Sequence, residues 1–219
     1  MLLLAIDTSA IASAALILDG ELLESFATED TRSHAEVLAS GIEGLLKARQ
    51  RPDAIAVGTG PGPFTGLRSG IATARTLSYV WQVPLAGVMS LDALAWDVVA
   101  SFEREQRTAS SFIVATDARR KEVYWSQYAP HGGLLEGPRV GAVSELPERL
   151  PVYGYGAGLY AEALADRVVP EFSRAQPQAS SLGLFAAHQL AAGRQLPDTT
   201  PLYLRESDAQ VPGPRKRAL

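Results

Sequence analysis

The first part of the chain alternates between continuous apolar runs and short polar breaks. Residues 2–6 form an apolar run that ends at Asp7-Thr8-Ser9, a pattern typical of a strand buried on both faces. Residues 12–18 and 21–27 flank Asp19-Gly20, a pair suited to the positive backbone angles of a tight hairpin turn. The pattern therefore predicts three strands at the start of the chain.

A helical period follows these strands. Apolar residues recur at helical spacing and form one stripe, made by Val37, Leu38, Ile42, Leu45 and Leu46. Residues 53–59 predict another buried strand, and after the glycine-rich loop the Ala- and Leu-rich residues 67–80 favour a helix. A strand over 83–88 and a helix over 91–102 complete the order βββαβαβα.

The second half repeats this order more weakly. Residues 112–115 lead into Thr116-Asp117, so that Asp117 occupies the place of Asp7, and strands are expected over 123–128, 139–143 and 152–155. Helices are expected near 160–165 and 182–192. We predict an α/β fold of two ribonuclease-H-like lobes, each a βββαβα-type unit. The charged stretch near 103–107 divides them into residues 1–104 and 105–219.

Composition and charge exclude several classes of protein. The 219 residues carry a net charge of -4, which argues against a protein that coats nucleic acid by bulk electrostatics. The charge is uneven, at net -5 over residues 1–104 and +1 over the remainder. The chain has no cysteine, which excludes disulfides and thiolate chemistry and fits a cytoplasmic protein. The opening apolar run is too short for a signal peptide or a membrane span.

The turns after the first strand of each half carry candidate chemistry. In a duplicated fold these turns face the cleft between the lobes, where Asp7, Thr8, Ser9, Asp117 and Arg119 would meet. A carboxylate can hold hydrated Mg²⁺ through waters, and a hydroxyl can donate to a phosphate, so the cleft is a candidate ATP–Mg site. Alternatively these side chains satisfy backbone groups at the strand ends.

The glycine-rich segment Gly60 to Gly70 lies between a predicted strand and a predicted helix. Such a loop can turn amide donors toward an anion. It lacks the Gly-Lys-Ser/Thr ending of a Walker loop, and Pro61 and Pro63 remove two donors. The other interpretation is a rigid elbow that lets the helix pack tightly on the sheet.

The sequence shows no metal centre or catalytic pair. His34, His131 and His188 are dispersed, so the helical spacing of a metal-binding pair is missing. No serine lies in a nucleophile-elbow setting. The basic run Arg215-Lys216-Arg217 is either a tRNA contact or a simple terminus. We expect no catalytic residue, no metal ligand and no cofactor that the chain requires.

Several motifs are distributed along the chain: Leu4-Ala5-Ile6-Asp7-Thr8-Ser9, Ser33-His34-Ala35-Glu36, Gly60 to Gly70, Gly87-Val88-Met89-Ser90-Leu91, Asp117-Ala118-Arg119-Arg120-Lys121-Glu122-Val123-Tyr124 and Pro201-Leu202-Tyr203-Leu204-Arg205. Together they resemble the bacterial TsaB family, also called YeaZ, of tRNA threonylcarbamoyladenosine synthesis. The resemblance spans nearly the whole chain. It implies the fold of the actin-like ATPase (ASKHA) superfamily, shared with the catalytic relative TsaD.

The resemblance also implies that TsaD is the catalytic subunit and that this chain is not. TsaD carries a His-x-x-x-His pair after a Gly-Val segment, whereas Ser90 and Leu94 stand at those places here. Because Leu94 has no metal-binding atom, the resemblance implies a non-catalytic subunit that supports transfer of threonylcarbamoyl to adenosine 37 of tRNAs reading ANN codons.

The expected partners are a TsaD homologue and the ATPase TsaE, with tRNA reached indirectly and a homodimer when the chain is alone. The expected contacts lie on the first two helices, whose stripes also suit an internal core: His34, Val37, Leu38, Ile42, Leu45, Leu67, Ile71 and Ala74. Two other functions stay open, a nucleotide-dependent ATPase or phosphotransferase and a metalloprotease-like hydrolase.

Overall fold

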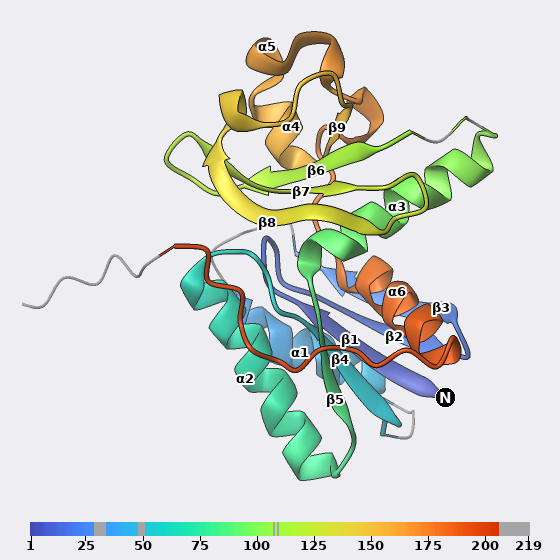
Figure 1. Cartoon of the computed structure of the whole chain (residues 1–219). Coiled ribbons are helices and arrows are strands. Elements are labelled where there is room, and N and C mark those ends of the chain that lie inside the picture. The colour runs from blue at the N-terminus through green and yellow to red at the C-terminus, as the bar shows by residue number, and fades with distance from the viewer. Residues whose placement is uncertain (29–33, 48–50, 107, 109, 206–219) are drawn as a thin grey trace, which may run out of the picture.

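The computed structural model contains two β-sheets with helices packed on both (Figure 1). It describes residues 1–28, 34–47, 51–106, 108 and 110–205. Within these ranges, no helix combines the length and the apolar character that a bilayer crossing requires.

The first sheet has five strands in the order β3-β2-β1-β4-β5. The strands are β1 (Leu2–Asp7), β2 (Ser13–Leu18), β3 (Glu21–Ala27), β4 (Ala54–Gly58) and β5 (Leu85–Val88). The first three are antiparallel, and β4 and β5 run parallel to β1. Asp19 and Gly20 have φ angles of 50° and 89°, which confirms the predicted hairpin turn.

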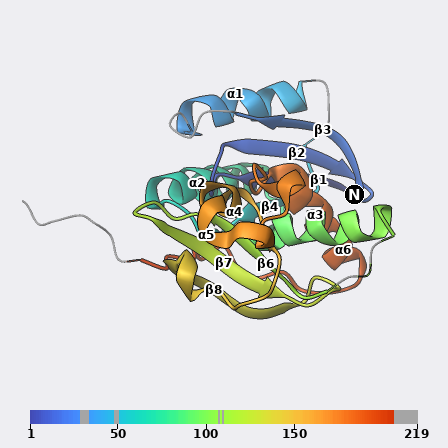
Figure 2. The same ribbon diagram turned by 90° about the horizontal axis from the view of Figure 1, so that it is seen from above.

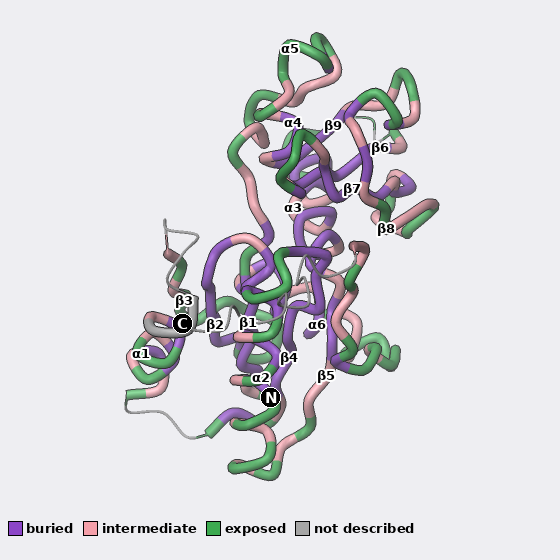
Figure 3. Tube along the Cα trace, turned by 90° about the vertical axis from the view of Figure 1, so that its left-hand side faces the viewer, coloured by how far each residue is buried: buried purple, intermediate pink, exposed green. Residues whose placement is uncertain are grey.

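Helices cover both faces of this sheet (Figure 2). Helices α1 (His34–Leu46) and α2 (Phe64–Trp81) pack against Leu4 and Ile6, whereas α6 (Ala179–Ala191) packs against Leu3 and Ala5 on the opposite face. Successive side chains of a strand point to opposite faces, so residues 2–6 of β1 need apolar side chains on both faces of the sheet. This double burial explains the unbroken run 2–6 (Figure 3).

The second sheet has four strands in the order β8-β7-β6-β9. They are β6 (Phe112–Asp117), β7 (Glu122–Tyr128), β8 (Leu134–Ala142) and β9 (Val152–Tyr153). Helix α3 (Ser90–Arg104) packs on one face. The other face is covered by α4 (Tyr155–Leu159), α5 (Ala161–Leu164) and the 3₁₀ turn η1 (Val143–Glu145). The 3₁₀ turns η2 (Ala165–Arg167) and η3 (Pro170–Phe172) follow, and Phe172 of η3 packs in the same core as α3.

The second lobe is shorter than the predicted βββαβα repeat. Between β8 and β9 the chain forms only η1, because Pro147 and Pro151 lack the amide donors that a longer helix needs. Two helices pack on the sheet formed by the other half of the chain. Helix α3 follows the first sheet in sequence but packs on the second sheet, and α6 follows the second sheet but packs on the first. The division at residue 104 stays a prediction, and this exchange ties the two lobes together.

Candidate functional site

Asp7, at the end of β1, lies completely buried beside the glycine-rich loop. Its Oδ1 accepts hydrogen bonds from the Ser9 amide at 2.9 Å and the Ser9 hydroxyl at 2.7 Å, and its Oδ2 accepts one from the Ser90 hydroxyl at 2.6 Å. A Cβ on Gly58 would lie 1.8 Å from Asp7 Oδ2, so a glycine at the end of β4 makes room for this carboxylate. The network satisfies both carboxylate oxygens inside the protein.

Thr8 anchors the start of α2 rather than opening toward solvent. It is fully buried, and its hydroxyl donates to the Gly66 carbonyl at 2.8 Å. A Cβ on Gly70 would lie 2.2 Å from Thr8 Oγ1, so helix and strand approach more closely than any larger residue allows. This geometry supports the interpretation of the glycine-rich segment as an elbow for tight helix–sheet packing.

A polar cleft of about 910 Å³ opens between the two lobes. The first lobe contributes Ser9, Ala10, Ile11, Thr28 and Pro63, and the rest of the chain contributes Thr116, Asp117, Arg119, Tyr155, Arg174, Gln176 and Gln178. The structure thus brings Ser9, Asp117 and Arg119 to one cleft, as the sequence predicted. It buries Asp7 and Thr8 behind the cleft wall, and whether the cleft holds a nucleotide stays a prediction.

The turn between β6 and β7 forms one rim of this cleft. Asp117 Oδ1 accepts a hydrogen bond from the Arg119 amide at 2.7 Å, and Asp117 Oδ2 lies 3.1 Å from Arg119 Nη1. Burial, and then the Asp117 carboxylate, raise the pKa of the Tyr124 hydroxyl. Through these two contacts Asp117 orients Arg119.

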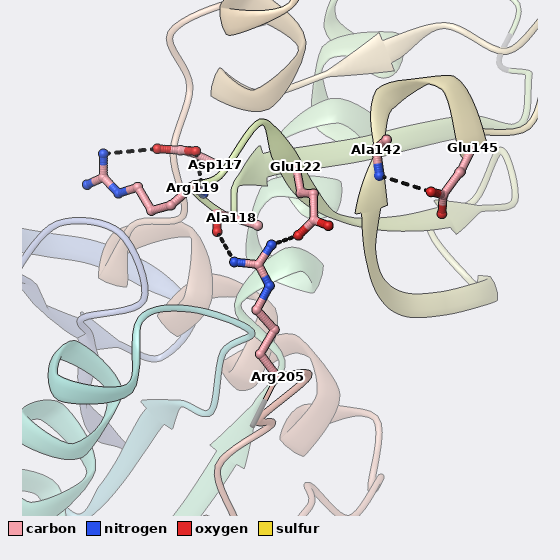
Figure 4. Close-up of polar contacts among 7 residues, drawn as sticks. All are labelled: Asp117, Ala118, Arg119, Glu122, Ala142, Glu145 and Arg205. Atoms are coloured by element: carbon pink, nitrogen blue, oxygen red, sulfur yellow. Dashed lines mark hydrogen bonds and ion pairs between the residues drawn. The ribbon is translucent and has the colours of Figure 1, made fainter. Parts of the chain in front are cut away.

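The segment 197–205, here called the C-terminal strap, connects the first lobe to this turn. The Gly87 amide donates to the Pro197 carbonyl at 2.8 Å, and the Leu202 amide donates to the Thr59 carbonyl at 2.8 Å. At its end, Arg205 Nη1 donates to the Ala118 carbonyl at 2.8 Å (Figure 4). Residues 201–205 of the strap are one of the motifs that carry the family resemblance, but no local pattern predicts which element they contact.

A second candidate site lies between α1 and α2. It is a groove of about 510 Å³ in the first lobe. Its lining residues are Ala39, Ile42, Glu43, Leu46, Lys47, Thr73, Leu77 and Trp81. Nearby on α2, Tyr79 and Val80 are 77% and 65% exposed. An apolar groove beside exposed apolar side chains is a surface suited to a protein contact.

The residues predicted to bind a partner on these helices fall largely in the core. Leu38, Ile42, Leu45, Leu67, Ile71 and Ala74 are buried against the first sheet. The internal-core interpretation of the stripe is confirmed for them, because each helix covers its own sheet first. Val37 is only partly buried. The His34 side chain and the run 215–217 lie outside the described residues.

The positions that would carry a metal-binding pair have structural partners. Ser90 donates to Asp7, and Leu94 lies in the apolar core beneath α3 with 1% of its surface exposed. Over the ranges that the structure describes, no three His, Cys, Asp or Glu residues gather as a metal site would require.

Known proteins resemble the chain, some of them along almost its whole length. A family model described as TsaD, tRNA N6-adenosine threonylcarbamoyltransferase, matches residues 21–210. An uncharacterized protein of Mycobacterium tuberculosis is 38% identical over 215 residues, which cover 94% of this chain and 93% of that protein. The tRNA threonylcarbamoyladenosine biosynthesis protein TsaB of Escherichia coli is 33% identical over 149 residues, 65% of this chain and 62% of that protein.

Solved structures agree with these matches. A structure described as YeaZ from Pseudomonas aeruginosa has a TM-score of 0.76 at 30% identity and covers 93% of this chain and 99% of that one. Another, with a TM-score of 0.77 and the same identity and coverage, is described as an uncharacterized protein with similarity to peptidase YEAZ from the same organism. The predicted α/β class with one mixed sheet in each lobe is confirmed, and the chain shares the fold of these YeaZ structures.

Proposed function

Because the chain belongs to the TsaB (YeaZ) proteins within the family that the TsaD model describes, we propose that it is a non-catalytic partner subunit in tRNA modification. It supports a TsaD homologue, together with a TsaE-type ATPase, in transferring threonylcarbamoyl to adenosine 37 of tRNAs that read ANN codons.

The observation that carries this proposal is the groove between α1 and α2. Its apolar lining includes Leu46, Leu77 and Trp81, and Glu43 and Lys47 supply one charge of each sign at its edge. A helix from a partner that presents apolar residues at helical spacing fits such a groove. In isolation, a second copy of the chain can use the same face under two-fold symmetry, which gives the proposed homodimer.

The interface test uses small exposed positions, because substituting a core residue such as Ile42 would unfold the lobe. Ala39→Glu places a charge in the groove without removing core atoms, and Ala161→Glu makes the same change on exposed α5 of the second lobe. We expect Ala39→Glu to abolish co-purification with the TsaD homologue and Ala161→Glu to leave it intact. Intact co-purification of a folded Ala39→Glu chain would reject this interface.

The function test is reconstitution by omission. TsaD, TsaE, tRNA and threonylcarbamoyl-adenylate are combined with and without this chain, and modified adenosine is quantified by mass spectrometry. We expect modification to be lost when the chain is left out. Undiminished modification without it, or modification by this chain alone, would refute the proposed role.

The cleft between the lobes supports a second candidate, a nucleotide-dependent enzyme. Ser9, Asp117 and Arg119 line a space of about 910 Å³, which is large enough for a nucleotide. The internal bonds of Asp7 weaken this candidate, since both of its carboxylate oxygens already accept hydrogen bonds from the protein. Calorimetry with ATP and Mg²⁺ decides, and absence of binding at millimolar nucleotide removes this function.

A further inference from the structure

Three consecutive cationic residues form the exposed turn between β6 and β7. Arg119, Arg120 and Lys121 have φ angles of 61°, 53° and 65°, all in the left-handed region. This conformation costs residues other than glycine roughly 1–2 kcal/mol each. It persists only where surrounding structure holds it, and it is often found at binding sites. We name residues 119–121 the cationic turn.

The protein holds this turn in place from two sides. Asp117 accepts a hydrogen bond from the Arg119 amide, and the Glu122 amide donates to the Arg119 carbonyl at 3.0 Å. From the other side, Arg205 of the strap donates to the Ala118 carbonyl and forms an ion pair with Glu122 (Figure 4). The turn is therefore positioned before any ligand arrives.

The turn presents cationic groups at the surface, because the side chains of Arg119, Arg120 and Lys121 are all exposed. Of the two carboxylates that flank it, Glu122 is paired with Arg205 of the strap, and Asp117 is paired with Arg119 of the turn itself. Arg119 remains 65% exposed despite its pair. Arg174, also exposed, lines the same cleft as Arg119 and extends the positive surface. A chain with a net charge of -4 thus concentrates cations at one rim of its cleft.

This charge is spread over a surface rather than gathered around one point. Arg119 lines the cleft, whereas Arg120 and Lys121 are exposed on the turn. A single small anion is best held by donors that converge on it. A row of exposed cations instead suits a polyanion whose charges repeat along its length, and nucleic acid phosphates provide such a row.

We propose that the cationic turn contacts the phosphate backbone of the tRNA that the complex modifies. The proposal rests on the proposed function, which brings tRNA to the assembly. It replaces the expectation that tRNA is reached only indirectly. Arg120 and Lys121 supply sequence-independent phosphate contacts, and Arg119 and Arg174 continue them toward the cleft.

The test compares two variants in which exposed cations are neutralised. In the double variant Arg120→Gln/Lys121→Gln the turn loses two charges. The control Arg149→Gln changes an exposed arginine that has the same left-handed backbone, at φ 66°, in the turn before β9. Binding of fluorescent tRNA is measured by anisotropy over a salt series, on the complex with the TsaD homologue and on the chain alone. Thermal melting checks that each variant is folded.

We expect the double variant to bind tRNA about 5- to 20-fold more weakly at roughly 0.1 M salt. The slope of log affinity against log salt concentration should fall in magnitude by about two, which is one for each phosphate contact removed. Arg149→Gln should change neither value. Co-purification with the TsaD homologue should be unchanged in all variants. Because co-purification is measured separately from tRNA binding, a failure of the proposed partnership is distinguished from a failure of the tRNA contact.

Two results would overturn the proposal. One is an affinity and a salt slope that match those of the unmodified chain, or that Arg149→Gln lowers equally. The other comes from titrating the chain with ATP and with inorganic phosphate. If the double variant loses binding of either small anion while its tRNA binding is unchanged, the turn is a site for a free anion instead.

Discussion

Replacing Asp92 with asparagine should make the protein more stable at neutral pH. Asp92 lies in the first turn of α3 and accepts a hydrogen bond from the buried Tyr128 hydroxyl at 2.9 Å. Burial raises the pKa of Asp92 to about 6, from 3.8, and the Tyr128 hydrogen bond opposes this rise. The ionised carboxylate is therefore less favourable in the folded protein than in the unfolded chain.

The sign and size of the stability change caused by Asp92→Asn follow from this raised pKa of Asp92. Because the folded pKa exceeds the unfolded one, the stability linked to Asp92 is fully present below about pH 4 and is lost as pH rises to about 6. A rise of this size corresponds to about 3 kcal/mol as an upper limit. Since Asp92 is partly exposed, we expect Asp92→Asn to stabilise the fold by about 2 kcal/mol at pH 7.5.

Urea unfolding of both proteins between pH 4 and pH 8 measures this effect. The advantage of asparagine should grow between about pH 4 and pH 6 and stay constant above about pH 7. Asp166→Asn, at an exposed aspartate of the second lobe, controls for the loss of one carboxylate. An Asp92→Asn protein that is less stable at pH 7.5, or whose difference does not change with pH, would contradict the reasoning.

Two further predictions concern packing and the strap. Gly58→Ala should destabilise the fold by about 3 kcal/mol or more, because its Cβ would overlap Asp7 Oδ2. The control Gly44→Ala has open space on α1 and should stabilise the fold by about 0.5–1 kcal/mol. Thermal melting compares the two variants, and equal melting temperatures would count against the Asp7 network. Arg205→Ala removes the pairing with Glu122 and should speed proteolysis near the turn between β6 and β7, and an unchanged cleavage pattern would show that the strap does not hold this turn.

Much of the fold was predictable because local patterns are strong in the first lobe. The run 2–6, the Asp19-Gly20 turn and the helix stripes each have one simple structural solution. The site was less predictable. Apolar stripes identify the buried side of α1 and α2 but not the groove between them, since that groove depends on how the helices cross. The role of Arg205 depends on a contact with residues more than eighty positions away.

By itself, the sequence determined the α/β class and the elements of the first lobe. These follow from spacing along one segment, which hydrophobic burial and backbone geometry convert directly into structure. Only the tertiary structure decided that α6 packs on the first sheet, that both Asp7 carboxylate oxygens are hydrogen-bonded inside the protein, and that Arg205 holds the cationic turn. Such features depend on contacts between segments that are distant in the sequence, and these contacts form only when the whole chain has folded.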